Sequence, residues 1–352
     1  MEQKIITIKE QIETAIEQRE NLKIVGGNSK SFLGRDIVGS KIDMSDYTGV
    51  ISYEPTELYI SVKAGTLLSD VNKVLSEKNQ ILAFEPAEVN EKTTIGGVVA
   101  TGLSGPRRPY AGSVRDFVLG ISCINGLAKN MSFGGQVMKN VAGYDLSRLL
   151  TGSYGSLAVI YDVTFKVLPI PEFESSGCKQ TSRQEALETM SELSVKSFPV
   201  SAACYYDGLL SVRFSGNKKV VKDSMQNFSL QEMDNSEQFW SELRNFKLPF
   251  FNSEKPIWRL SVPSSSNIGF EKDDYVIDWG GAQYWLASER PANEIFSLAE
   301  GFGGSALLFH GGDRSGDVFQ PLSKGIFKLQ QNLKQAFDPY RILNREKMYK
   351  TL

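Results

Sequence analysis

The stretch from residue 93 to residue 120, TTIGGVVATGLSGPRRPYAGSVRDFVLG, combines a threonine pair, two adjacent glycines and a short apolar run. Thr93 or Thr94 is placed to cap a helix whose first turn contains Gly96 and Gly97. Glycines in that turn let the helix end lie directly against a ligand, and its free amide groups and dipole favour a negative charge. The stretch therefore predicts an anion site, with close helix packing through small residues as the alternative.

A second glycine-rich loop lies earlier, in LKIVGGNSKSFLG at residues 22–34, directly after a strand-like run. Glycine lets the backbone turn sharply, and the amides freed in such a turn form a concave anion site. The nucleotide-triphosphate loop requires a glycine before its lysine, whereas Ser29 precedes Lys30 here. The spacing G-x-G-x-x-G is not found either. Two such loops predict a diphosphate cofactor between two lobes, although a plain tight turn remains the alternative for the first loop.

Composition narrows the class of protein. With 352 residues, 41% hydrophobic and 23% charged, the chain is expected to be globular and long enough for two domains. A formal net charge of -2 and the lack of a basic run argue against nucleic acid as a partner. No apolar stretch approaches the roughly 20 residues that cross a bilayer, and the N-terminal residues are charged throughout, unlike a signal peptide. We therefore expect a cytoplasmic protein.

Cysteine and histidine are scarce. Cys123, Cys178 and Cys204 are an odd number without a C-x-x-C pair, which argues against a disulfide framework, zinc or an iron–sulfur cluster. His310 is the single histidine, so we expect no metal site, and any chemistry must come from one imidazole, from carboxylates or phenols, or from a bound cofactor. His310 ends a strand-like run in a glycine-rich turn, which suits a catalytic residue, although a structural imidazole is the commoner case.

The apolar pattern predicts a mixed α+β first half. Thr7 and Glu10 stand in capping-box register before an apolar repeat, so we expect a helix that begins there. Short runs rich in β-forming residues then alternate with a further helix. Asn125 and Gly126 form the pair preferred in two-residue hairpin turns, because both tolerate positive φ.

A domain boundary is expected near residue 170. The run SLAVIYDVTFKVLPIPEF reads as a long strand stopped by Pro169 and Pro171, which cannot donate to a ladder. We therefore assign residues 1–170 to the first domain and residues 171–352 to the second.

The second domain shows a different pattern. Helical segments alternate with hairpins expected at Asp207-Gly208 and Gly280-Gly281, as in an antiparallel sheet backed by helices. A last helix is expected over residues 322 to 337.

Three segments together resemble a known family. They are GGNSKS, then residues 93–120, then GGQVMKNVAGYDLSRLLTGSYGSLAVIYDVTFKVLP, and they are similar to the PCMH-type FAD-binding domain of the vanillyl-alcohol-oxidase superfamily. Within it, the chain most resembles the FAD-binding subunits of bacterial glycolate oxidases, and FDPYRILNREKMY resembles the segment with which those proteins end. The resemblance implies a domain of two α/β subdomains, followed by a cap domain for substrate and a C-terminal segment that returns to the FAD domain. Residues 172–305 carry little of the resemblance.

The resemblance also implies cofactor contacts. The first loop is expected to hold the pyrophosphate, the second cluster to follow the ribityl chain and pyrophosphate, and later positions to flank the cofactor. Because Asn28 stands where many relatives carry a flavin-linking histidine, non-covalent FAD is expected. The residues so implied are Gly26, Gly27, Asn28, Ser29, Lys30, Ser31, Pro86, Thr94, Gly96, Gly97, Thr101, Gly102, Ser104, Gly112, Ser113, Arg115, Asp116, Val159 and Ile160.

The substrate implied is a 2-hydroxy acid, and we expect a cationic side chain to bind its carboxylate. A guanidinium group suits a carboxylate because it can form two parallel hydrogen bonds with it. Arg107 and Arg108 are the candidates, with a solvated or adenine-side role as the alternative. Asp145 is expected to cap the helix that follows it. The larger catalytic subunits of the family share a two-histidine metal site, which one histidine cannot build.

Three functions stay open at this point. The first is the FAD-binding subunit of a glycolate oxidase or dehydrogenase complex, in which electrons pass to a homologous FAD-linked catalytic subunit and an iron–sulfur subunit. Such a complex would also be this chain's only link to the inner membrane. The second is a stand-alone FAD-dependent dehydrogenase of lactate or a related acid. The third is a subunit whose flavin is structural.

Overall fold

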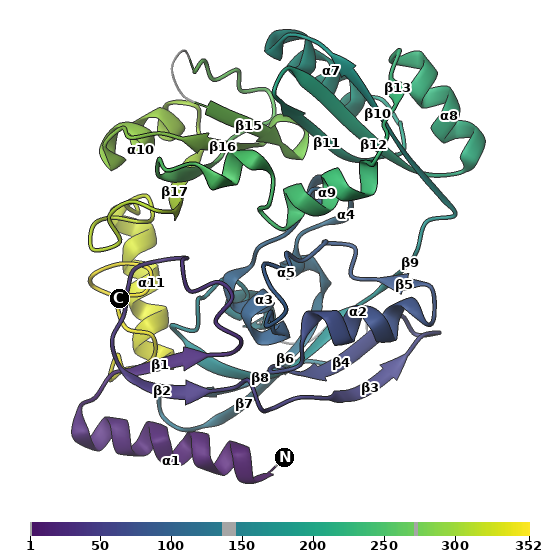
Figure 1. The fold of residues 1–352 in the computed structure, drawn as a ribbon. Coiled ribbons are helices and arrows are strands. Elements are labelled where there is room, and N and C mark those ends of the chain that lie inside the picture. Colours follow the sequence, from purple (N-terminus) through teal and green to yellow (C-terminus); the bar gives the residue numbers. More distant parts are fainter. Residues whose placement is uncertain (1, 136–145, 271–273) are drawn as a thin grey trace.

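The structure is a computed structural model that describes residues 2–135, 146–270 and 274–352. The expected helix cap Asp145 and most of the motif GGQVMKNVAGYD lie outside the described residues. Two large sheets carry the fold, one in the lower and one in the upper part of Figure 1.

The lower sheet has five antiparallel strands in the order β3-β4-β8-β6-β7. Side chains that alternate along its strands face two different helix layers. Cys123 and Ile160 pack with helices α2 and α3, whereas Ile124 and Val159 pack with helix α1. The elements are β3 (Val50–Glu54), β4 (Tyr59–Lys63), β8 (Ala158–Lys166), β6 (Val118–Asn125), β7 (Asn130–Gly134), α1 (Glu2–Gln18), α2 (Leu68–Ser76), α3 (Ile95–Thr101), α4 (Arg108–Ala111), α5 (Val114–Phe117) and α6 (Leu146–Leu150).

The upper sheet has eight strands in the order β13-β10-β12-β11-β15-β16-β14-β17, and all its pairs are antiparallel. Helices α7 and α10 pack on one face, and aromatic residues pack between the other face and the lower part of the molecule. The elements are β10 (Phe173–Gln180), α7 (Arg183–Val195), β11 (Val200–Tyr206), β12 (Leu209–Gly216), α8 (Lys218–Asn227), β13 (Gln231–Glu232), α9 (Ser236–Arg244), η1 (Pro249–Asn252), β14 (Ile257–Ser261), β15 (Asp274–Asp278), η2 (Trp279–Gly281), β16 (Gln283–Ala287), α10 (Ala292–Gly301) and β17 (Ser305–His310).

The C-terminal segment packs against the beginning of the chain. After helix α11 (Lys324–Phe337), Leu343 forms a parallel bridge with Leu22, the first residue of β1 (Leu22–Val25). A buried ion pair of 2.8 Å joins Lys334 to Asp338 at this junction. Strand β1 itself pairs in parallel with β2 (Ser40–Asp43), and β5 (Gln80–Ile81) pairs with β9 (Leu168–Pro169). The expected domain boundary falls between β9 and β10.

Most expected elements are found, with two corrections. The first helix begins at Glu2 and not at Thr7, because the Thr7 hydroxyl donates to the Gln3 carbonyl one turn earlier instead of capping a helix start. The hairpin after Asn125 is confirmed, but β7 begins only at Asn130, so its loop is longer than two residues. None of the helices in the described ranges is both long and apolar enough to cross a membrane.

Candidate functional site

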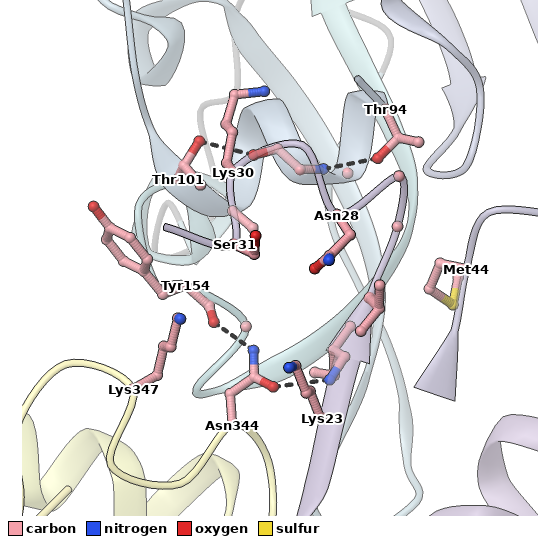
Figure 2. A pocket seen from close by; sticks show the side chains of 18 of the residues that line it. Lys23, Asn28, Lys30, Ser31, Met44, Thr94, Thr101, Tyr154, Asn344 and Lys347 are labelled. Carbon is pink, nitrogen blue, oxygen red and sulfur yellow. Dashed lines mark hydrogen bonds between the residues drawn. The ribbon is translucent and has the colours of Figure 1, made fainter. Parts of the chain in front are cut away.

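A cavity of about 360 Å³ lies where both glycine loops, strand β8 and the C-terminal segment meet (Figure 2). Its wall contains most of the first loop and part of helix α3. The residues expected from the sequence that line it are Gly26, Gly27, Asn28, Ser29, Lys30, Ser31, Thr94, Gly96, Gly97, Thr101 and Ile160.

The first loop presents unused backbone donors. Among the described residues, no acceptor is found for the amides from Gly26 to Lys30, although neighbouring amides such as that of Ser31 are bonded. Asn28 adopts a left-handed conformation with φ of 56°. A left-handed residue within a row of free amides forms a concave site that attracts anions.

Glycine is required in this loop because the two glycine-rich segments touch. A Cβ on Gly27 would lie 1.4 Å from the carbonyl oxygen of Lys92, and one on Gly26 would lie 2.4 Å from Thr94 Oγ1. The hydroxyl of Thr93 also donates to that of Ser29 at 3.1 Å. Each loop therefore fixes the position of the other.

Helix α3 begins at the expected residue, but not all backbone amides of its first turn are free to bind a ligand. Thr94 is its N-cap, and its Oγ1 accepts a hydrogen bond from the Gly97 amide at 3.4 Å. The amide of Gly96 donates to the Ala64 carbonyl at 2.7 Å, so it is not free for a ligand. A Cβ on Gly96 would lie 2.9 Å from that of Ala64, so this glycine lets α3 approach the end of β4.

Positive charge surrounds the cavity. Lys23, Lys30 and Lys347 all line it. Burial lowers the pKa of Lys30 to about 8 against the opposing field of Glu88, and its Nζ, sealed from solvent, has no hydrogen-bond partner among the residues that the structure describes. Burial likewise lowers the pKa of Lys347 to about 8, and its Nζ donates to the Arg35 carbonyl at 2.9 Å. An anion in the cavity would offset this charge.

Several cavity residues were not expected from the sequence. Asn344 bridges two walls, since its Oδ1 accepts from the Ile24 amide at 2.8 Å and its Nδ2 donates to the Tyr154 carbonyl at 2.7 Å (Figure 2). The segments that carry Tyr154 and Asn344 belong to the motifs TGSYGS and RILNREKMY, so the resemblance was the available indicator. The unexpected polar residues are Lys23, Asp36, Tyr154, Asn344 and Lys347.

The other expected cofactor residues do not line this cavity, and their roles stay predictions. Gly102 ends helix α3 in a left-handed conformation, and the Ser104 hydroxyl accepts from the Val114 amide. Ser113 and Asp116 form the capping box of α5. The remaining members of this group are Pro86 and Val159, which are buried, Arg115, which is exposed, and Gly112, which has a positive φ.

The two arginines expected at the substrate lie outside the cavity lining. Arg107 is buried between two carboxylates: its Nε lies 3.3 Å from Glu85 Oε1, and its Nη2 contacts Glu174. The guanidinium of Arg108 lies over the ring of Trp279, 4.2 Å from the centroid.

His310 also lies outside the cavity lining. It is exposed, and its ring meets that of Phe32 edge-on at 5.6 Å. Partial burial, helped by the positive charge of Arg314, lowers the pKa of His310.

The cavity fits the pyrophosphate of FAD. The five amides without an acceptor among the described residues offer donors to a doubly charged linker, and Lys23 and Lys347 offer positive charge. In the described part of the chain, no group of three or more His, Cys, Asp or Glu residues is placed to hold a metal ion.

Comparison with known proteins gives concordant results. The FAD binding domain family matches residues 5–133. Glycolate oxidase subunit GlcE of Escherichia coli K12 is 43% identical over 343 residues, which cover 97% of each chain. D-lactate dehydrogenase of Anaerostipes hadrus is 29% identical over 134 residues, 38% of this chain and 28% of that protein.

Among solved structures, alkyldihydroxyacetonephosphate synthase superposes with a TM-score of 0.67 at 15% identity, covering 97% of this chain and 75% of that one. This similarity concerns the fold alone. Together with the matching family, it confirms the expected α+β architecture with a PCMH-type FAD-binding domain.

Proposed function

The chain belongs to the family of FAD-binding glycolate oxidase subunits, and on this premise we propose that it holds FAD in a complex that oxidises glycolate to glyoxylate. The observation that carries the proposal is the row of unused amides from Gly26 to Lys30 beside three lysines. This set of donors matches a non-covalently bound diphosphate. We keep the domains 1–170 and 171–352 as part of the proposal.

When bound, FAD supplies the acceptor for a hydride from a carbon that bears a hydroxyl group. The chain's own residues bind the cofactor and hold the cavity wall in position. Lys30, whose Nζ is buried behind the first loop, adds positive charge near the pyrophosphate, and Asn344 holds Tyr154 and strand β1 at fixed positions in the wall. We propose that the expected residues outside the cavity lining, Gly102 and Ser104 among them, hold the loops in place.

The E. coli relative is a subunit of glycolate oxidase, and we propose that this chain likewise has partner subunits. A homologous FAD-linked subunit and an iron–sulfur subunit would receive the electrons, since a chain with three cysteines that form no cluster motif offers no such exit. We further propose a cytoplasmic location, with any contact to the inner membrane made through these partners.

The stand-alone dehydrogenase is a weaker alternative. The D-lactate dehydrogenase from A. hadrus shares only 28% of its own length with this chain, whereas the E. coli subunit shares 97%. A structural flavin remains the third possibility.

One anaerobic experiment separates the three. The purified chain is incubated with FAD, freed of unbound cofactor, and mixed with glycolate or D-lactate, first alone and then with both partner subunits, while flavin absorbance is followed. Bound flavin that bleaches only with the partners supports the proposal. Bleaching of the isolated chain supports the stand-alone enzyme, and flavin in the complex that never bleaches supports the structural role. A folded chain that stays colourless overturns all three.

A further inference from the structure

A second cavity, of about 490 Å³, lies between the edge of the upper sheet at β17 and the C-terminal segment. None of the residues expected at the cofactor or the substrate lines it. Among its lining residues in the described ranges, Arg259 is the only cation and Glu300 the only carboxylate. Ser261, Gln320 and Tyr349 add polar groups to the wall.

Arg259 faces away from the core that its own strand helps to form. Its neighbours on β14, Trp258 and Leu260, belong to the apolar core beneath helices α7 and α10. Side chains alternate along a strand, so Arg259 lies on the opposite face, which is turned towards the lower part of the molecule. There its guanidinium lies 6.0 Å from the ring centroid of Trp279.

Within residues 2–135, 146–270 and 274–352, no carboxylate neutralises the charge of Arg259. Its Nε is sealed from solvent without a hydrogen-bond partner, and no carboxylate in the described part of the chain pairs with it. Burial and the nearby positive charge of Arg108 both lower its pKa. Buried guanidinium groups are normally paired, because an unpaired buried charge is costly. Arg259 is half-buried, and the described part of the chain supplies no anion for it, so a bound anion would be a suitable partner.

The second cavity is separated from the cofactor cavity by an aromatic partition. The ring of Tyr154, which lines the cofactor cavity, meets that of Phe319 edge-on at 5.3 Å. Phe319 lines the second cavity and packs against Tyr349 at 5.8 Å. Tyr154 is also an electrostatic neighbour of Arg259. An anion on Arg259 would thus lie next to the wall of the proposed cofactor site.

We propose that Arg259 binds the carboxylate of a small 2-hydroxy acid in the second cavity. The proposal rests on the proposed function for the identity of the acid, and on the cavity and the unpartnered guanidinium for its position. A guanidinium binds a carboxylate through two parallel hydrogen bonds, which an ammonium group cannot reproduce. Glu300 lies in the same cavity and opposes binding by its negative charge.

The test measures binding of glycolate to the FAD-loaded chain by calorimetry. A charge-assisted contact corresponds to about 10- to 100-fold in affinity, so Arg259→Gln is expected to weaken glycolate binding by that factor. Arg259→Lys is expected to retain part of the affinity, and Glu300→Gln to increase it about twofold to fivefold. Glycolamide, which has no carboxylate, should bind equally to wild type and to Arg259→Gln.

The flavin content of each variant separates this proposal from the proposed function. Equal flavin content together with unchanged glycolate affinity in Arg259→Gln overturns the role of Arg259 and leaves the cofactor proposal standing. A colourless wild type overturns the cofactor proposal, while glycolate binding to the unloaded chain still tests Arg259. If Arg259→Gln does not fold, an unchanged affinity in both Arg259→Lys and Glu300→Gln overturns the proposal.

Discussion

The side-chain oxygen of Asn344 accepts a hydrogen bond from the amide of Ile24 at 2.8 Å, although 320 positions separate the two residues. The side-chain Nδ2 of Asn344 donates to the Tyr154 carbonyl at 2.7 Å. One buried side chain thus joins three distant segments at the cavity wall.

Asn344→Ala removes both bonds and leaves two buried backbone groups without partners. We expect the free energy of unfolding to fall by about 2–4 kcal/mol and FAD to bind more weakly. Urea denaturation and flavin titration measure the two effects. Asn332→Ala, on the exposed face of helix α11, is the control and should change neither. Wild-type stability in Asn344→Ala would contradict the bridging role.

Gly27→Ala places a Cβ within 1.4 Å of the Lys92 carbonyl oxygen. The backbone fixes the position of a Cβ, and the Lys92 oxygen is itself a backbone atom, so one of the two loops must move. We expect FAD affinity to fall about tenfold to a hundredfold, because a forced contact of this kind costs roughly 1–3 kcal/mol. Gly325→Ala, where the added carbon has open space, is the matched control. Equal flavin retention by both variants would show that the first loop does not hold the cofactor.

Lys30 makes the stability of the FAD-free chain depend on pH. Its pKa is about 8 in the folded chain and about 10.4 when unfolded, so between these values the unfolded chain binds more protons. The free energy of unfolding should therefore rise between about pH 8 and about pH 9.5. In Lys30→Met, the free energy of unfolding should rise less steeply over the same range. Denaturation series at several pH values measure both slopes, with exposed Lys78→Met as control. Parallel slopes for wild type and Lys30→Met would refute the buried ammonium.

Substitution of Arg107 distinguishes a role in substrate binding from a role in stabilising the fold. This residue belongs to a buried network in which Glu85 also accepts from Arg213 at 2.7 Å. Arg107→Met leaves Glu85 and Glu174 to share Arg213 as their remaining cation, so we expect the free energy of unfolding to fall by about 1–3 kcal/mol, with glycolate affinity unchanged in the folded fraction. Lys222→Met, on the exposed side of α8, should be nearly neutral. A stable Arg107→Met with weakened glycolate binding would instead support the substrate role.

Local chemistry predicted some of the site from the sequence alone. The cap at Thr94 could be expected, because a helix cap depends on neighbours in the chain. The glycines of both loops could be recognised, but the segments that they touch, such as Lys92 beside Gly27, could not. The engaged amide of Gly96 could not, since its acceptor, Ala64, comes from another strand. The capping-box register at Thr7 was misleading because a threonine hydroxyl can also donate to a carbonyl one turn earlier within a helix, as that of Thr7 does to Gln3.

Arg259 and Asn344 show the limit of such reasoning. An arginine in a strand-like run gives no indication of whether a carboxylate will meet it, and this depends on how two sheets pack. The resemblance of FDPYRILNREKMY, and no pattern within residues 1–170, implied that a C-terminal segment returns to the first domain, and residues 344 and 347 line the cavity. Contacts between segments so far apart are fixed by tertiary packing and leave no periodic pattern in the sequence.

The position of Asn344 and Lys347 in the cavity wall has a consequence for biosynthesis. A nascent chain that has emerged from the ribosome only as far as β8 already carries both glycine loops but not the side chains that close the pocket. Full loading with flavin must then wait until the segment that carries Asn344 and Lys347 has been synthesised and docks beside β1. A fragment cut to the matched region of residues 5–133 would capture the cofactor poorly, whatever the integrity of its loops.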